Sequence, residues 1–192
     1  LTSYDGKKIS YDEIGNPTSY YNGKNWKMTW ENGRQLSQIK RGSKTWDFTY
    51  DMSGVRSGKT VTTTDSTTGE TTSTEYKYTT LSGKLVRVEY NTTVLDIVYD
   101  EAGQPFSIRY KGKPTATGTL YYYVLNAQGD VVGLLNAAGE LVVEYEYDPW
   151  GMEPHGTGSL GHCLYQQAVL QLKRSKKPVV SYSFVFLYVI LL

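Results

Sequence analysis

Tyr11-Asp12-Glu13-Ile14-Gly15-Asn16-Pro17 decides the fold, because its frame returns twice along the 192-residue chain. The two other copies are Tyr50-Asp51-Met52-Ser53-Gly54-Val55-Arg56 and Tyr99-Asp100-Glu101-Ala102-Gly103-Gln104-Pro105. Each copy has Tyr, then Asp, then two variable residues, then Gly. Asp starts a turn by accepting backbone N–H groups, and Gly supplies the positive φ that closes a turn with a bulge. The frame therefore predicts that one strand ends at Tyr and the next begins after Gly.

Further copies fill the rest of the chain, and most are looser, with Leu or Trp in place of Tyr or with Asn, Glu or Ser in place of Asp. They are Trp30-Glu31-Asn32-Gly33-Arg34, Leu81-Ser82-Gly83-Lys84-Leu85, Leu125-Asn126-Ala127-Gln128-Gly129-Asp130, Leu135-Asn136-Ala137-Ala138-Gly139-Glu140 and Tyr147-Asp148-Pro149-Trp150-Gly151. The candidate functional residues are consequently structural turn residues: Tyr11, Asp12, Gly15, Tyr50, Asp51, Gly54, Tyr99, Asp100, Gly103, Asn126, Gly129, Asp130, Asn136, Gly139, Tyr147, Asp148, Trp150 and Gly151.

The segments between the turns have the composition of strands. The chain holds 18 Tyr and 19 Gly in a Thr-rich background, and no segment before Pro154 keeps an apolar period of helical spacing. We expect strands at 26–31, 36–40, 44–50, 85–90, 93–99, 119–125, 131–136 and 141–147, and a longer Thr-rich hairpin of 59–66 with 71–78. The predicted fold class is all-β. Because one such hairpin cannot bury its apolar face alone, the hairpins should join into a curved sheet.

The run from Tyr121 to Gly151 carries a resemblance to a known family. Tyr122-Tyr123-Val124-Leu125-Asn126-Ala127-Gln128-Gly129-Asp130-Val131-Val132-Gly133-Leu134, continued through Gly139, Tyr145, Tyr147, Asp148 and Trp150, resembles the junction where YD repeats enter the Rhs-associated core. With the Tyr-Asp-x-x-Gly turns, the resemblance to the Rhs and YD-repeat family covers about four fifths of the chain.

The resemblance implies both a fold and a function. Family members build a spiralling β-shell, which in bacteria encloses a toxic or otherwise active C-terminal domain used in contact-dependent competition, and which in animals forms part of the teneurins. It implies a protein that is secreted or displayed at the cell surface. Its partners would be further repeats of the same parent chain and the encapsulated C-terminal domain. The chain begins at Leu1 without Met or a signal peptide, so we expect it to start within a longer protein.

The resemblance stops after Pro154, and we expect two parts: a YD-repeat sheet at 1–154 and a divergent tail at 155–192. The tail lacks the family's core ending and self-cleavage site, and it ends in an almost wholly apolar run from Val179 to Leu192. The sequence admits three origins of the tail: a membrane anchor, for which the run is short; an element that completes the fold in a longer context; and a frameshift or premature end. The last is preferred.

The frameshift hypothesis predicts that the missing core sequence survives in another reading frame. Translating the encoding DNA in its other two frames downstream of codon 160 should reveal a run resembling RYRGYYYD. If neither frame holds such a run, the hypothesis is wrong.

Composition argues against an enzyme and against several kinds of partner. Twenty Lys and Arg against 19 Asp and Glu leave a net charge of +1, so no nucleic acid is expected as a partner and a membrane is an unlikely one. No cofactor or metal is expected either, since His155, His162 and Cys163 do not make a zinc site and lie at or beyond the break. The carboxylates are explained by turns and by solvent-facing positions. We therefore predict no catalytic residues.

A second function remained open, a cell-surface carbohydrate-binding or adhesive module. Its basis is a set of aromatic residues that could stack on sugars: Tyr20, Tyr21, Trp26, Trp30, Tyr121, Tyr122 and Tyr123. The alternative explanation, which we favoured, is that these rings pack inside the sheet and pair across strands.

Overall fold

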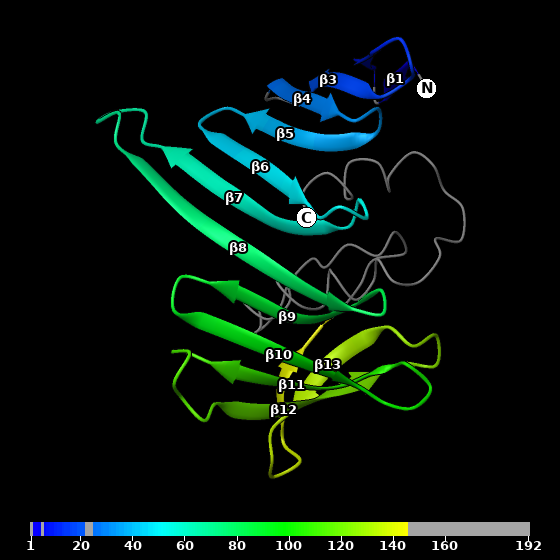
Figure 1. Ribbon diagram of the computed structural model, residues 1–192, viewed down its shortest axis with the longest axis vertical. Helices are drawn as coiled ribbons and strands as arrows, with labels where there is room; N and C mark the ends of the chain where they lie inside the picture. The colour runs from blue at the N-terminus through cyan, green and yellow to red at the C-terminus, as the bar shows by residue number, and fades with distance from the viewer. Residues whose placement is uncertain (1, 5, 22–24, 146–192) are drawn as a thin grey trace. The chain divides into compact units, whose positions relative to one another are not determined.

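Strands are the regular secondary structure of this protein, as the computed structural model shows for residues 2–4, 6–21 and 25–145 (Figure 1). The described strands are β1 (Ser3–Tyr4), β2 (Lys7–Tyr11), β3 (Pro17–Tyr21), β4 (Asn25–Glu31), β5 (Gln35–Arg41), β6 (Lys44–Tyr50), β7 (Arg56–Thr64), β8 (Thr71–Leu81), β9 (Lys84–Tyr90), β10 (Thr93–Tyr99), β11 (Pro105–Lys111), β12 (Thr119–Leu125), β13 (Val131–Leu135) and β14 (Leu141–Glu144). The described residues contain no helix, so the predicted all-β class of repeated antiparallel hairpins is confirmed.

Two compact units divide the chain, Leu1–Lys77 and Tyr78–Leu192, with the division inside β8. In each unit the strands follow one another in chain order, and each pairs antiparallel with its neighbour in sequence. This order is what short turns impose, because a tight turn joins only adjacent antiparallel strands. The predicted boundary at residue 154 lies outside the described residues.

The core of the first unit follows from alternation along its strands. In β4 the side chains alternate between exposed and buried, and Trp26 and Met28 belong to the buried set. Register places Met28 opposite Ile39 and Ile39 opposite Trp46. Ile39 is fully buried, and burying such a side chain contributes about 1.5–3 kcal/mol.

The second unit repeats this construction with aliphatic residues. Val88 pairs with Leu95, and in the next rows Ile97 pairs with Ile108. Leu134 continues the buried set in β13, and Val88, Leu95, Ile108 and Leu134 are all fully buried. Cross-strand rows of this kind depend on register, since a slip of one residue would turn every one of these side chains to the other face.

Two of the looser copies of the turn frame form different turns from the three Tyr-Asp copies. At Asn32-Gly33 and at Ser82-Gly83 both residues have positive φ, between 46° and 80°. Two consecutive left-handed residues make a shorter connection, which leaves no room for an Asp-x-x-Gly loop. The strict and the short turns are therefore two distinct ways of reversing the chain.

Gly54 should not tolerate a side chain. Its φ is +77°, and a Cβ there would lie 3.2 Å from Nε2 of Gln35. We expect Gly54→Ala to lower the free energy of unfolding by about 1–2 kcal/mol, the cost of a left-handed L-residue. Gly112→Ala is the matched control, because Gly112 lies outside the left-handed region and a Cβ there would meet only the Tyr110 hydroxyl, at an ordinary 3.9 Å. Its effect should stay within about 0.5 kcal/mol. Urea denaturation followed by circular dichroism measures both, and equal effects would contradict the conformational argument.

Candidate structural site: the repeated turns

Five turns close hairpins with the same pair of backbone hydrogen bonds. In each, the amide of the Asp or Asn donates to the carbonyl four residues later at 2.9 Å, and the Gly amide donates back to the Asp or Asn carbonyl at 2.9–3.1 Å. The turns begin at Asp12, Asp51, Asp100, Asn126 and Asn136. Their glycines, at 15, 54, 103, 129 and 139, have φ between +77° and +86°.

The side-chain oxygen of the Asp or Asn accepts backbone amides of its own turn. Oδ1 accepts the amide four residues on at 2.7–3.0 Å in all five turns. In four of them it also accepts the amide two residues on, at 2.8–3.2 Å. An Asn amide oxygen does this as well as a carboxylate, which is why Asp and Asn exchange at this position.

A bulge in the strand pairing accompanies every one of these turns. The register shifts immediately before the Asp or Asn, at Ser10/Tyr11, Thr49/Tyr50, Val98/Tyr99, Val124/Leu125 and Leu134/Leu135. The residue before the Asp or Asn then pairs with the residue six positions later, for example Tyr50 with Arg56. A bulge bends its strand and increases the local twist. The turn frame thus sets both the reversal and the bend of each hairpin.

A longer variant of the turn joins β7 to β8. The Asp65 amide donates to the Glu70 carbonyl at 2.8 Å and the Gly69 amide donates to the Asp65 carbonyl at 2.9 Å, so the loop has one residue more. The Asp65 carboxylate accepts the amides of Thr67 and Thr68, and these bonds lower the pKa of that carboxyl. Thr64 to Ser73 are all exposed.

Aromatic rings tie the end of one strand to the start of the strand before it, an arrangement that we term the aromatic clip. The Tyr50 hydroxyl donates to the Leu36 carbonyl at 2.9 Å, and the Tyr99 hydroxyl donates to the Leu85 carbonyl at 2.8 Å. Trp30 does the same through Nε1, which donates to the Pro17 carbonyl at 2.7 Å. Burial raises the pKa of Tyr99 to about 12, so its hydroxyl remains a donor at neutral pH.

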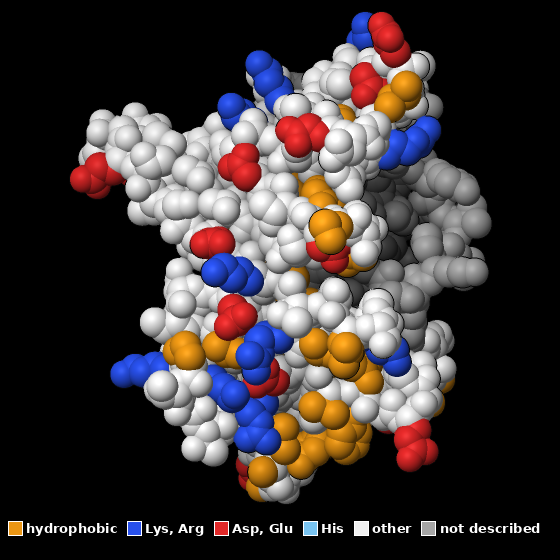
Figure 2. All heavy atoms as spheres, viewed as in Figure 1, with side chains coloured by type: hydrophobic (Ala, Val, Ile, Leu, Met, Phe, Trp, Pro, Cys, Tyr) orange, Lys and Arg blue, Asp and Glu red, His pale blue; other side chains and the backbone are white. Residues whose placement is uncertain are grey.

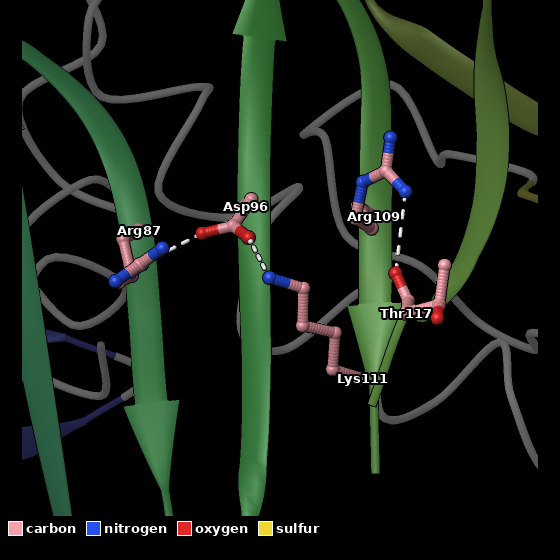
Figure 3. A network of polar contacts seen from close by, with 5 residues as sticks. All are labelled: Arg87, Asp96, Arg109, Lys111 and Thr117. Atoms are coloured by element: carbon pink, nitrogen blue, oxygen red, sulfur yellow. Dashed lines mark hydrogen bonds and ion pairs between the residues drawn. The ribbon is translucent and has the colours of Figure 1, made fainter. Parts of the chain in front are cut away.

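The sequence frame missed the role of Trp30 and an ion network on the second unit. Asp96 lies between Arg87, whose Nε is 2.6 Å from Oδ1, and Lys111, whose Nζ is 2.9 Å from Oδ2 (Figure 3). Burial alone would raise the pKa of the Asp96 carboxyl, but the hydrogen bonds from Arg87 and Lys111 outweigh it and the pKa is lowered. These residues come from β9, β10 and β11, so only the strand register brings them together.

The predicted sugar-stacking aromatics are placed mostly inside the sheet. Tyr20, Trp26 and Tyr121 are buried, and the Trp26 ring stacks on Trp46 with a centroid distance of 6.4 Å. Trp30, Tyr122 and Tyr123 are half-buried. The structure therefore presents these rings chiefly as packing residues.

Two predicted groups of residues lie outside the described part of the chain: Tyr147, Asp148, Trp150 and Gly151, and the tail with His155, His162 and Cys163. Among the described residues, no group of three or more His, Cys, Asp or Glu could hold a metal ion. The same part of the chain contains no helix that is long and apolar enough to cross a membrane.

Comparison with known proteins finds relatives among bacterial nucleases. The chain is 30% identical over 154 residues to the tRNA3(Ser)-specific nuclease WapA of Bacillus spizizenii and 30% identical to the tRNA nuclease WapA of Bacillus subtilis strain 168. Each alignment covers 79% of this chain but 6% of the relative. The chain resembles Rhs and YD-repeat proteins. This confirms the resemblance that the Tyr-Asp-x-x-Gly turns predicted.

Solved structures show a more distant similarity. The Photorhabdus luminescens Tc holotoxin pore matches with a TM-score of 0.47 and 16% identity, over 78% of this chain and 10% of that one. The TcdB2-TccC3 structure matches with a TM-score of 0.41 and 16% identity, over 80% of this chain and 7% of that one. No family model matches the chain.

The side-chain oxygen of Asp51 should stabilise its turn, and the negative charge of the carboxylate should contribute little. Asp51→Ala removes the acceptor of the Ser53 and Val55 amides, so we expect a loss of about 1 kcal/mol in the free energy of unfolding. Asp51→Asn keeps the acceptor, as Asn126 and Asn136 already do, and should cost much less. Urea denaturation of the two variants measures the two free energies of unfolding. An Asn variant as unstable as the Ala variant would show that the charge, and not the oxygen, holds the turn.

The aromatic clip should be measurable by removing single hydroxyls. Tyr50→Phe and Tyr99→Phe each delete the donor to a backbone carbonyl, so each should cost about 1 kcal/mol. Tyr50→Phe also removes the acceptor of Arg56 Nη2, which lies 3.3 Å from the hydroxyl. Tyr122→Phe serves as the control, since the Tyr122 hydroxyl makes no hydrogen bond with described residues. Hydrogen exchange at the Leu36 and Leu85 hairpins should rise only in the first two variants. Equal exchange in all three would contradict the clip.

The Asp96 network should make part of the stability pH-dependent. A carboxyl whose pKa is lowered by folding stabilises the folded state above its ordinary value of 3.8, and this stability is lost as the pH falls through the folded pKa. We therefore expect the wild type to be more stable than Asp96→Asn near neutral pH and the difference to shrink below about pH 4. Urea midpoints across pH measure this, and a gap that stays constant would refute it.

Proposed function

We propose that this chain is a structural segment of a larger Rhs-type protein whose β-shell encloses a C-terminal toxin or effector. The observation that carries the proposal is the set of five equivalent Asx-Gly turns, in a chain of which 79% aligns with a WapA nuclease. Such turns make hairpins that are interchangeable units, and interchangeable units can extend a sheet without changing its construction.

The catalytic work of the parent protein then belongs to a domain other than this one. The relatives are named as tRNA nucleases, yet the chain spans 6% of their length. The turn carboxylates and amides, such as Asp51 and Asn126, already accept two backbone N–H groups each. An acid fixed in this way serves the turn and is poorly placed to shuttle protons to a substrate. We propose a nuclease or another toxin as the enclosed cargo.

Placement outside the cell follows from the same proposal. A protein used in contact-dependent competition must be secreted or displayed at the cell surface. Its partners are further repeats of the parent chain, which continue the sheet, and the C-terminal domain that the shell encloses. Continuation is also what an antiparallel sheet with open ends needs, because unpaired edges invite association.

The test uses the complete polypeptide that the gene encodes. Limited proteolysis followed by mass spectrometry should find the region C-terminal to the repeats protected in the native protein and cleaved after unfolding. A Tyr50→Phe, Tyr99→Phe double variant should shorten the protection, and Tyr122→Phe should leave it unchanged. A C-terminal region cleaved equally fast in native and unfolded protein, or a gene product without such a region, would refute the enclosure.

A further inference from the structure

An exposed row of apolar side chains crosses one face of the second unit. Val98 is 51% exposed, Phe106 53% and Leu141 53%, and Val142 beside Leu141 is 40% exposed. A monomeric protein seldom leaves neighbouring apolar side chains of this size in water without a use for them. Figure 2 shows hydrophobic side chains gathered next to Lys and Arg in its lower part.

The strand register connects the exposed members of the row through the buried Ser107 and the half-buried Tyr122 and Leu135. Val98 pairs with Ser107, Ser107 with Tyr122, Tyr122 with Leu135, and Leu135 with Leu141. Phe106 lies in the bulge of this row and packs edge-on against Tyr122, with ring centroids 5.6 Å apart. The row therefore runs across the strands from β10 to β14. We term it the apolar row.

A charged row lies beside the apolar row on the same face. Asp96 is two residues before Val98 in β10, and Arg109 is two residues after Ser107 in β11, so both point to the same side as the apolar row. Asp96 is already neutralised by Arg87 and Lys111 (Figure 3).

Arg109 is the cation of this row that has no acidic partner among the described residues. Its Nη1 donates to the Thr117 carbonyl at 3.2 Å, while Asp96, which lies opposite Arg109 in the register, forms its ion pairs with Arg87 and Lys111 (Figure 3). Arginine is one of the residue types enriched among those that dominate the energy of protein interfaces. Guanidinium groups bind carboxylates with two parallel hydrogen bonds, which fixes orientation as well as adding energy.

We propose that this face docks an amphipathic, acidic polypeptide segment. Its apolar side chains would cover Val98, Phe106 and Leu141, and one of its carboxylates would pair with Arg109. The exposed apolar side chains decide the class of partner, because a polypeptide can cover them with apolar side chains of its own. The cations Arg87, Lys111 and Arg109 outnumber the single carboxylate of Asp96, so the partner should be acidic. The proposal stands apart from the shell, since any acidic amphipathic segment satisfies it.

Two synthetic peptides test the proposal with the full chain. One is an amphipathic helix of about 18 residues, five turns, with Leu on one face and Glu on the other; its counterpart has Lys at every Glu position. Fluorescence anisotropy should show that the wild type binds the acidic peptide at least about tenfold more tightly than the basic one. Arg109→Glu should reverse this preference. Phe106→Ser should weaken binding of the acidic peptide about tenfold or more.

Controls separate docking from loss of structure and from other occupants. Lys40→Glu changes an exposed cation of the first unit and should leave both affinities unchanged. Val98→Ser repeats the Phe106 test at another exposed position, so a folding defect in one variant does not end the experiment. Equal affinity for the two peptides would overturn the proposal. So would self-association abolished by Phe106→Ser, or binding of single-stranded RNA in competition with the acidic peptide.

Discussion

The structure depends on one interaction, the side-chain oxygen of an Asp or Asn that accepts backbone N–H groups within its own turn. Without this oxygen the amide four residues later would lose its side-chain acceptor. The left-handed conformation of the intervening Gly would then be less strongly favoured. With it, the chain reverses over a fixed number of residues. A fixed reversal sets the bulge, and the bulge sets which side chains face the core.

The aromatic residue before the Asp adds the second half of the repeat. Tyr50 and Tyr99 do more than end a strand, since their hydroxyls reach the carbonyl at the start of the preceding strand. Trp30 shows that the essential property is a donor at the tip of a flat, apolar ring, because Nε1 takes the place of a hydroxyl. The polar tip of the ring satisfies a backbone carbonyl of the preceding strand. The unit can therefore accept either residue.

This construction suits a scaffold. Hydrogen bonds inside each turn depend only on local sequence, so a hairpin can be added or lost without rebuilding its neighbours. The two faces of each unit are then free to differ. In the second unit one face carries the buried Val88, Leu95 and Ile108, while the other carries the apolar row and the ion network.

The sequence by itself determined the all-β class, the antiparallel hairpins and the places where the chain reverses. It could do so because Asp, Asn and Gly act within five residues, and a local rule is visible in a linear string. It did not separate the short turns at Asn32 and Ser82 from the longer frame, since both contain a polar residue and Gly.

Only the tertiary structure decided which side chains meet across strands. Arg87, Asp96 and Lys111 lie on three strands, and their contact depends on the strand register. The same holds for the Trp30 clip and for the exposed row from Val98 to Leu141. Register results from all the packing on a face at once, and no short stretch of sequence contains it.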